Sequence, residues 1–309
     1  MITSVFRKST PLNLFLVVIL MLVFFFITVF QDLSWINSAV SIVKIGGLFL
    51  ISLGSIFIAN FVAKKNGLSK DSSFAMFFCF LFLLFFPSVL VNTNLLLSNF
   101  FILLALRRLI SLQSLKASKE KIFDASLWIF LAALLHFWSI LYIILVFISI
   151  IFHVARDYRN WVLPFIAFLA LAVISVCVSL IFSKDILGYI TENAVLNFDI
   201  DYFTNTYQNI AFSIYLTIAL FFVISMFASL SSKLLFLHAS YKKIIACFFI
   251  AIVIFAISPN KSNDLLIYTI APLSIMATSH IEEKQPLLKQ EMVLGVLILC
   301  SLFAFFSQL

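Results

Sequence analysis

The chain has 309 residues, of which 64% are hydrophobic and 11% are charged. Soluble domains carry roughly 45–50% apolar and about 25% charged residues, so this composition excludes a soluble globular protein. It predicts an all-α, polytopic transmembrane bundle. The formal net charge of +7 is explained by basic loops on one side of a membrane, and it gives no reason to expect nucleic acid as a partner.

Four apolar segments open the chain. Arg7 and Lys8 precede the first one, so the positive-inside rule predicts a cytoplasmic N-terminus and an outer loop at 31–38. No A-x-A cleavage site follows the first segment, which indicates a retained span and not a signal peptide. The second segment returns to the cytoplasm at Lys64 and Lys65. The predicted spans are 12–30, 39–63, 74–91 and 95–106, and the last of these is short for a bilayer.

The apolar run 122–155 is predicted to fold back on itself. As one helix it would be roughly 50 Å long, whereas the hydrocarbon core of a bilayer is roughly 30 Å thick. Basic clusters flank the run at 107–121 and at Arg156 and Arg159, so both ends are expected in the cytoplasm. The run therefore forms a hairpin with its outer tip near His136, and its two predicted spans are 122–136 and 138–155.

The remaining chain adds five predicted spans and one long outer loop. That loop, 183–208, is the longest extracytoplasmic segment, and the C-terminus is expected outside. This arrangement places 17 of the 20 basic residues in cytoplasmic segments, with Lys44, Lys184 and Lys261 as the exceptions. The sequence thus predicts one membrane domain over 1–309 with about 11 spans, the last five being 161–182, 209–230, 244–257, 265–279 and 292–306.

Asp32 is the leading catalytic candidate. It directly follows the first span in FQDLSW, where a carboxylate at the water interface can act as a base or bind a divalent cation. The alternative is a carboxylate that caps or solvates a helix end. Lys44, in the first turns of the second span, is an unusual cation in an apolar context. It either contacts a lipid phosphate near Asp32 or extends its amine out to the interface.

Three further groups lie in outer segments. Asp199 and Asp201 form a D-x-D pair that is able to share one Mg²⁺ or Mn²⁺, or that forms an ordinary solvated pair. His136 beside Trp138 suits proton transfer or a phosphate contact, or else interfacial anchoring. Lys261 in PNKSND is able to reach the same outer face, or it belongs to an ordinary polar turn.

The sequence lacks the motifs that mark several classes of enzyme. The chain has no P-loop, GxSxG, HExxH or dinucleotide fingerprint, and its four cysteines lie in separate apolar runs without CxxC spacing. These cysteines are expected to be buried hydrophobes. No intramembrane series of carboxylates marks an ion-coupled carrier, although transport is harder to exclude than the soluble enzyme classes.

The layout resembles the GT-C class of multi-pass glycosyltransferases, which use polyprenyl-phosphate sugar donors. The likeness rests on Asp32 after the first span, on the region 92–106, and on the segments RRLISLQSLKASKEK, FDASLWIFLAALLHFW and RDYRNWVLPF. It implies that Asp32 is the base or metal ligand. The opening MITSVFRKSTPLNLFLVVILMLVFFF is also similar to a family of bacterial inner-membrane proteins of uncharacterised function. The chain departs from GT-C enzymes in its short first outer loop and in having no second carboxylate beside Asp32.

Three functional hypotheses follow. The first is a GT-C-like transferase, or a degenerate relative, that takes a sugar from a polyprenyl phosphate at the outer face of the bacterial inner membrane. Asp32 would be catalytic, with Lys44, His136 and Lys261 as phosphate contacts. The second is a noncatalytic subunit that binds lipid or a small membrane-protein partner within a cell-envelope complex. The third is a transporter of a lipid or small molecule.

Overall fold

The computed structural model describes residues 2–182, 186–198, 205–259, 261–283 and 286–309. Within these ranges the chain is helical and contains no β-strand, so the all-α prediction is confirmed. The α-helices are α1 (Ile2–Phe6), α2 (Pro11–Val29), α3 (Ala39–Lys65), α4 (Phe74–Leu83), α5 (Thr93–Ile110), α6 (Ser118–Leu135), α7 (Ile143–His153), α8 (Arg159–Phe182), α9 (Ile186–Asn193), α10 (Thr206–Ser229), α11 (Leu235–Ile257), α12 (Ile267–Ile281) and α13 (Leu287–Ser307).

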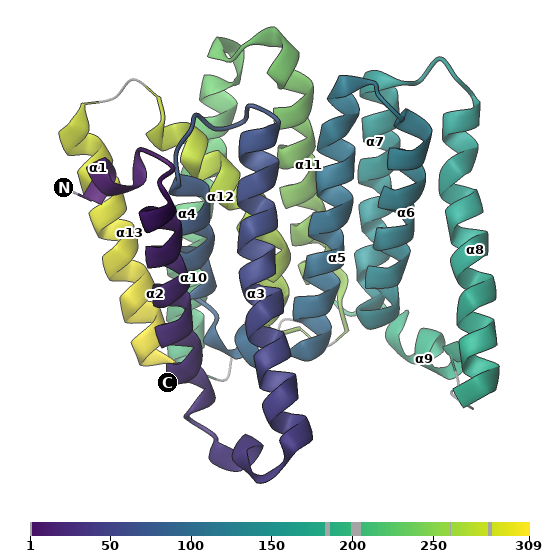
Figure 1. The fold of residues 1–309 in the computed structure, drawn as a ribbon, viewed down its shortest axis with the longest axis horizontal. Coiled ribbons are helices and arrows are strands. Elements are labelled where there is room, and N and C mark those ends of the chain that lie inside the picture. The colour runs from purple at the N-terminus through teal and green to yellow at the C-terminus, as the bar shows by residue number, and fades with distance from the viewer. Residues whose placement is uncertain (1, 183–185, 199–204, 260, 284–285) are drawn as a thin grey trace.

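Short 3-10 turns connect several of these helices. They are η1 (Leu33–Asn37), η2 (Pro87–Val91), η3 (Ser111–Ser114), η4 (Phe137–Tyr142), η5 (Leu230–Ser232) and η6 (Asn263–Leu266). The long helices stand side by side in one bundle, with α8 at one edge and α2 and α13 at the other (Figure 1). The hairpin of α2, η1 and α3 extends beyond the other helices at the lower end of this view (Figure 1).

Local sequence signals explain where several helices begin. The hydroxyl of Thr10 accepts a hydrogen bond from the backbone N–H of Asn13, and Pro11 occupies the first turn of α2, where a missing N–H does no harm. Asn92 caps α5 by accepting from the N–H of Leu95 at 3.3 Å. Asn205 caps α10 in the same way. Each cap satisfies an N–H group that the helix itself leaves unpaired.

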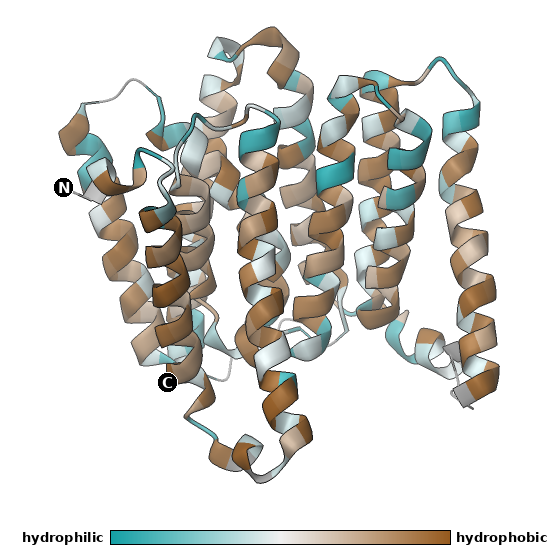
Figure 2. Cartoon of the chain, viewed as in Figure 1, coloured by the Kyte–Doolittle hydropathy of each residue, from teal (hydrophilic) through white to brown (hydrophobic). Residues whose placement is uncertain are grey.

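Eight helices in the described ranges are long and apolar enough to cross a membrane. The predicted spans 74–91 and 138–155 contain shorter apolar helices, and α6 carries charged residues in its first two turns. Apolar residues cover the middle of the long helices, whereas hydrophilic residues gather near their ends (Figure 2). This distribution matches the band of hydrocarbon that a membrane bundle must face.

The apolar run 122–155 breaks at the predicted position. His136 ends α6 with an extended backbone, η4 follows, and α7 packs back against α6. The N–H of His136 still donates to Ala132 O at 2.9 Å, so the last turn of α6 remains closed. The length argument from the sequence therefore locates this reversal correctly.

α5 and α11 are among the helices that are longer than the sequence analysis expects. α5 continues to Ile110, with Arg107 and Arg108 in its last turn, where cations interact favourably with the helix dipole. α11 begins at Leu235, so Lys243 lies inside a helix and not in a cytoplasmic loop. The Lys243 side chain is fully buried, and its ammonium donates to Leu109 O at 2.6 Å and contacts His153 Nε2 at 3.2 Å.

The centre of the bundle is formed by α4 and α12. All residues of α4 are buried, and α12 is buried along almost its whole length. Side-chain hydrogen bonds join α12 to its neighbours, among them Tyr215 to Thr269 at 2.6 Å, Tyr268 to Ser98 at 2.7 Å and Cys79 to Ser274 at 3.0 Å. These bonds satisfy hydroxyl groups that would be costly to leave unpaired in an apolar interior.

We predict that Tyr268→Phe destabilises the bundle by about 1 kcal/mol, the usual net value of one hydrogen bond. The change removes the phenol that donates to Ser98 Oγ while keeping the ring. Unfolding in a mild detergent, followed by circular dichroism, measures the effect. The control is Tyr207→Phe, because Tyr207 is 56% exposed. Equal stability of the two variants would contradict the prediction.

Candidate functional site

A polar cavity of about 510 Å³ brings together two of the predicted site residues, His136 and Lys261. His136 comes from the end of α6, and Lys261 from the loop between α11 and η6. The other lining residues come from the end of α6, the start of α5, η4, α9, η6 and the same loop: Asn92, Asn94, Leu95, Leu135, Phe137, Trp138, Tyr189, Asn193, Pro259, Ser262 and Leu265.

Neighbouring groups fix the ring of His136. Its Nε2 lies 3.3 Å from Ser258 Oγ, and that hydroxyl donates to Ile254 O at 2.7 Å. Because the single proton of the hydroxyl is used, Ser258 accepts from His136 Nε2–H. This tautomer leaves His136 Nδ1 with a lone pair that is able to accept a proton. The ring of Tyr268 packs nearby, with its centroid 5.9 Å from that of His136.

Lys261 is held at the cavity by the segment after α9. Its ammonium donates to Asn197 O. The N–H of Asn197 in turn donates to Ile257 O at 3.2 Å, which docks the segment against the end of α11. An ammonium carries three protons, so this contact leaves Lys261 with protons available for a ligand.

Other lining groups supply hydrogen-bonding capacity. Trp138 Nε1 is buried and has no hydrogen-bond partner in the described part of the chain. A buried indole N–H normally has a partner, so this donor is available to a ligand in the cavity. Burial raises the pKa of the Tyr189 phenol, which therefore remains a protonated donor at neutral pH. Asn92 is already engaged, because its side-chain oxygen caps α5 and its side chain also hydrogen-bonds the Asp264 carboxylate.

Asp32 and Lys44 line a different cavity, of about 440 Å³. It lies at the tip of the α2–α3 hairpin, and both residues are exposed. The predicted proximity of Lys44 to Asp32 is therefore seen, but neither residue lines the cavity that contains His136 and Lys261. Trp35 also lines the Asp32 cavity, and its buried Nε1 has no partner among the described residues.

The described residues do not fit a divalent cation. Asp32 is the only carboxylate that lines its cavity, and the cation Lys44 shares the same space. No group of three or more His, Cys, Asp or Glu side chains in the described ranges is arranged to hold a metal ion. Asp199 and Asp201 lie outside the described residues. A Mg²⁺ or Mn²⁺ ion accordingly enters no step below.

The sequence analysis overlooked Ser258 and treated Trp138 only as an anchor. Ser258 is an ordinary serine at the end of an apolar helix, and no local pattern points to His136, which lies 122 residues earlier. The buried state of Trp138 Nε1 depends on side chains that arrive from distant segments. A sequence signal did exist for Asn92 and Asn94, because polar residues between two apolar segments commonly line cavities or turns.

No family model, curated protein or solved structure matches this chain. The cavities, their charges and their hydrogen bonds are therefore the basis for the function proposed below.

We predict that Lys261→Met loosens the segment after α9, because the substitution removes the ammonium that binds Asn197 O. Chymotrypsin should then cleave several-fold faster after Leu196 and Phe198, which are 55% and 66% exposed. Mass spectrometry of timed digests identifies the cut. The matched control is Lys44→Met at the cavity of Asp32. Unchanged cleavage in Lys261→Met would show that the lysine does not hold this segment.

Proposed function

We propose that this protein is a GT-C-like transferase that takes a sugar from a polyprenyl phosphate in the cavity lined by His136 and Lys261. One observation carries the proposal: a histidine with an available ring nitrogen and a lysine meet in one cavity from segments far apart in the sequence. A proton acceptor beside a cation suits group transfer from a phosphorylated donor.

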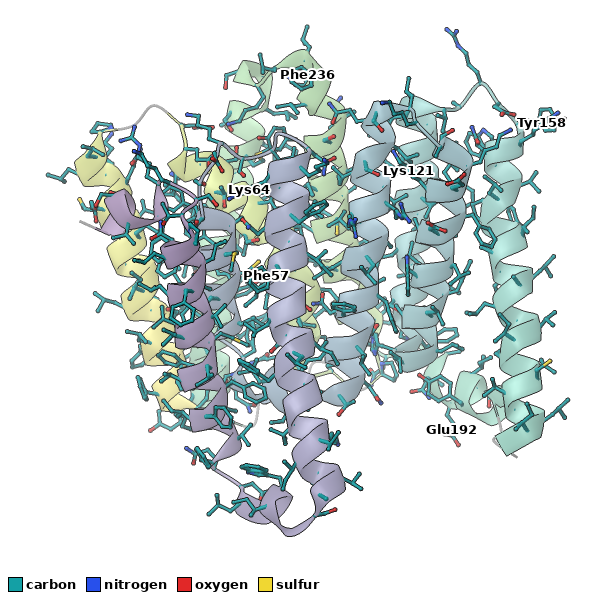
Figure 3. The ribbon with its side chains drawn as sticks, viewed as in Figure 1. Phe57, Lys64, Lys121, Tyr158, Glu192 and Phe236 are labelled. Atoms are coloured by element: carbon teal, nitrogen blue, oxygen red, sulfur yellow. The ribbon has the colours of Figure 1, made fainter. Side chains whose placement is uncertain are left out.

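The proposal includes a membrane orientation. The chain crosses the bacterial inner membrane about 11 times, with its N-terminus in the cytoplasm and its C-terminus outside. In support, Lys121, Tyr158 and Phe236 lie toward one end of the bundle, and Glu192 lies at the other (Figure 3). The lysine-rich end corresponds to the cytoplasm under the positive-inside rule. The cavity of His136 then opens on the outer side.

Labelling tests this orientation. In a cysteine-free background, we expect Glu192→Cys to react with a membrane-impermeant maleimide in intact spheroplasts. Lys116→Cys, in the basic loop before α6, should react only after the membrane is opened, because the two sites lie on opposite sides. The reverse pattern would move the cavity of His136 to the cytoplasm and end the proposal.

The cavity suits a lipid-linked sugar for three reasons. The ammonium of Lys261 provides charge for the phosphate, as lysine does in many phosphate sites. Trp138 Nε1, Asn94 and Tyr189 offer hydrogen-bonding groups for sugar hydroxyls. Leu135, Phe137 and Leu265 add an apolar wall beside which the first part of the prenyl chain can lie.

In the proposed step, an acceptor hydroxyl attacks the anomeric carbon of the bound sugar. The bond from that carbon to the phosphate oxygen breaks, and the polyprenyl phosphate leaves with the electron pair beside Lys261. The proton of the acceptor hydroxyl moves to His136 Nδ1, which is unprotonated because Nε2–H donates to Ser258. General-base assistance of this kind typically contributes about 10²- to 10⁴-fold.

We predict that His136→Gln lowers the turnover of a polyprenyl-phosphate sugar by at least about 100-fold, because the proton acceptor is lost. Lys261→Met should chiefly weaken donor binding and raise KM. The measurement is the release of polyprenyl phosphate by purified protein in lipid vesicles, with a panel of donor sugars. Asp32→Asn is the matched comparison, since Asp32 lines the other outer cavity.

The same assay separates the alternatives. If Asp32→Asn loses turnover while His136→Gln remains fully active, Asp32 is the general base and the assignment of His136 is overturned. No turnover by the wild-type protein with any donor, together with lipid binding that Lys261→Met weakens, would identify a noncatalytic lipid-binding subunit.

A further inference from the structure

The tip of the α2–α3 hairpin carries a cavity of about 440 Å³ that the function proposed above does not use. Its charged lining residues are one acid, Asp32, and one base, Lys44. We call this space the hairpin cavity. The rest of its wall comes from the end of α2, the loop after it, η1, α3 and η2: Thr28, Val29, Gln31, Trp35, Ser41, Ile45, Leu48 and Val91.

The two charges line the same space without forming an ion pair with each other. The Lys44 ammonium has no hydrogen-bond or ion-pair partner among the described residues. Asp32 makes an interaction within the protein, but a carboxylate accepts at about four lone-pair sites, so it keeps capacity for a ligand. One acid and one base leave the cavity neutral overall, which suits neither a simple anion nor a simple cation. The pair suits a ligand that carries one charge of each sign.

The length of α3 places Lys44 at the edge of the hydrocarbon layer. Lys64, in the last turn of α3, lies toward the end of the bundle away from the hairpin tip (Figures 1 and 3). The distance along the helix from Lys44 to Lys64 is about 30 Å at 1.5 Å per residue. The hydrocarbon core of a bilayer is also roughly 30 Å thick. With Lys64 at one interface, Lys44 therefore lies at the level of the lipid phosphates of the opposite leaflet.

Trp35 adds a hydrogen-bond donor to the hairpin cavity. Its Nε1 is buried and has no partner in the part of the chain that the structure describes, whereas a buried indole N–H normally has one. Three residues directly next in sequence to lining residues are exposed apolar side chains: Phe30, Leu33 and Val43. A polar cavity with such a border fits a molecule that has a polar head and apolar tails.

We propose that the hairpin cavity binds the headgroup of a zwitterionic membrane phospholipid of the ethanolamine class. The ammonium of the headgroup donates to the Asp32 carboxylate, and the phosphate accepts from the Lys44 ammonium and from Trp35 Nε1–H. Hydrogen bonds between ionised groups are stronger than those between neutral groups, and the exposed apolar border contacts the acyl chains. This site does not depend on the function proposed for the cavity of His136.

The proposed contacts predict a preference among lipids. A choline headgroup has no N–H to donate to Asp32, and a glycerol headgroup has no positive charge. The cavity should therefore bind phosphatidylethanolamine more tightly than phosphatidylcholine or phosphatidylglycerol.

Lipid retention by the full-length protein tests this preference. Native mass spectrometry from nanodiscs that contain the three lipids in equal amounts measures which lipid stays bound. We expect phosphatidylethanolamine to be retained preferentially, and Asp32→Asn to lower its retention at least about fivefold. Asparagine keeps an acceptor oxygen at this position, so the backbone of the hairpin tip is preserved. The matched control is Asp71→Asn, because Asp71 is exposed and does not line the hairpin cavity.

Charge reversal gives a result that misfolding cannot produce. Asp32→Lys places two ammonium groups in the cavity, so retention should shift at least about fivefold from phosphatidylethanolamine toward the anionic phosphatidylglycerol. Lys44→Met should weaken retention of phosphatidylethanolamine. Lys65→Met should not, because Lys65 is an exposed lysine of the same helix outside the cavity. Titration calorimetry with glycerophosphoethanolamine in detergent measures binding of the headgroup without its acyl chains.

Each outcome decides the proposal. Preferential retention of phosphatidylethanolamine that falls in Asp32→Asn and Lys44→Met, but not in the two control variants, supports it. Equal retention of the three lipids by the wild type, retention led by another lipid, or an unchanged preference in Asp32→Lys would overturn it. Binding of glycerophosphoethanolamine without any preference among the intact lipids would assign the cavity to a soluble zwitterion and overturn the lipid assignment.

Discussion

The bundle depends on keeping α12 away from lipid. This helix contains Pro272, which lacks an N–H and so leaves one backbone carbonyl without its helical partner. It also carries several hydroxyl side chains, which are costly in hydrocarbon but satisfied when neighbouring helices supply partners. Tyr215, Ser98 and Cys79, from three different helices, supply such partners. The longer, more apolar helices surround α12 because its composition requires a protein environment.

The position of α12 also helps to place the cavity of His136. The loop that leads into α12 contributes Lys261 and Ser262 to this cavity, and η6 contributes Leu265. Packed interiors deform little, so the buried α12 restrains the loop that leads into it.

Sequence reasoning succeeded where composition and charge act over a single segment. The 122–155 reversal follows from helix length against bilayer thickness and from the basic residues on both flanks. It failed where the position of a residue depends on partners that are distant in the sequence. Lys243 was expected in a cytoplasmic segment because the positive-inside rule places basic residues between spans on that side. The structure satisfies its ammonium with Leu109 O and His153, which lie 134 and 90 residues away in the sequence. No local pattern identifies such partners.

For the candidate site, sequence reasoning likewise identified local features and missed those that depend on distant segments. Sequence position favoured Asp32, since it directly follows the first span, and it paired Asp32 with Lys44, as the shared cavity now shows. The sequence did not reveal the wall between that cavity and the cavity of His136. Val91 lines one cavity and the next residue, Asn92, lines the other, so the end of η2 separates them. A general base must lie within hydrogen-bond reach of the proton it accepts. His136 lines the same cavity as Lys261, whereas Asp32 lines the other one.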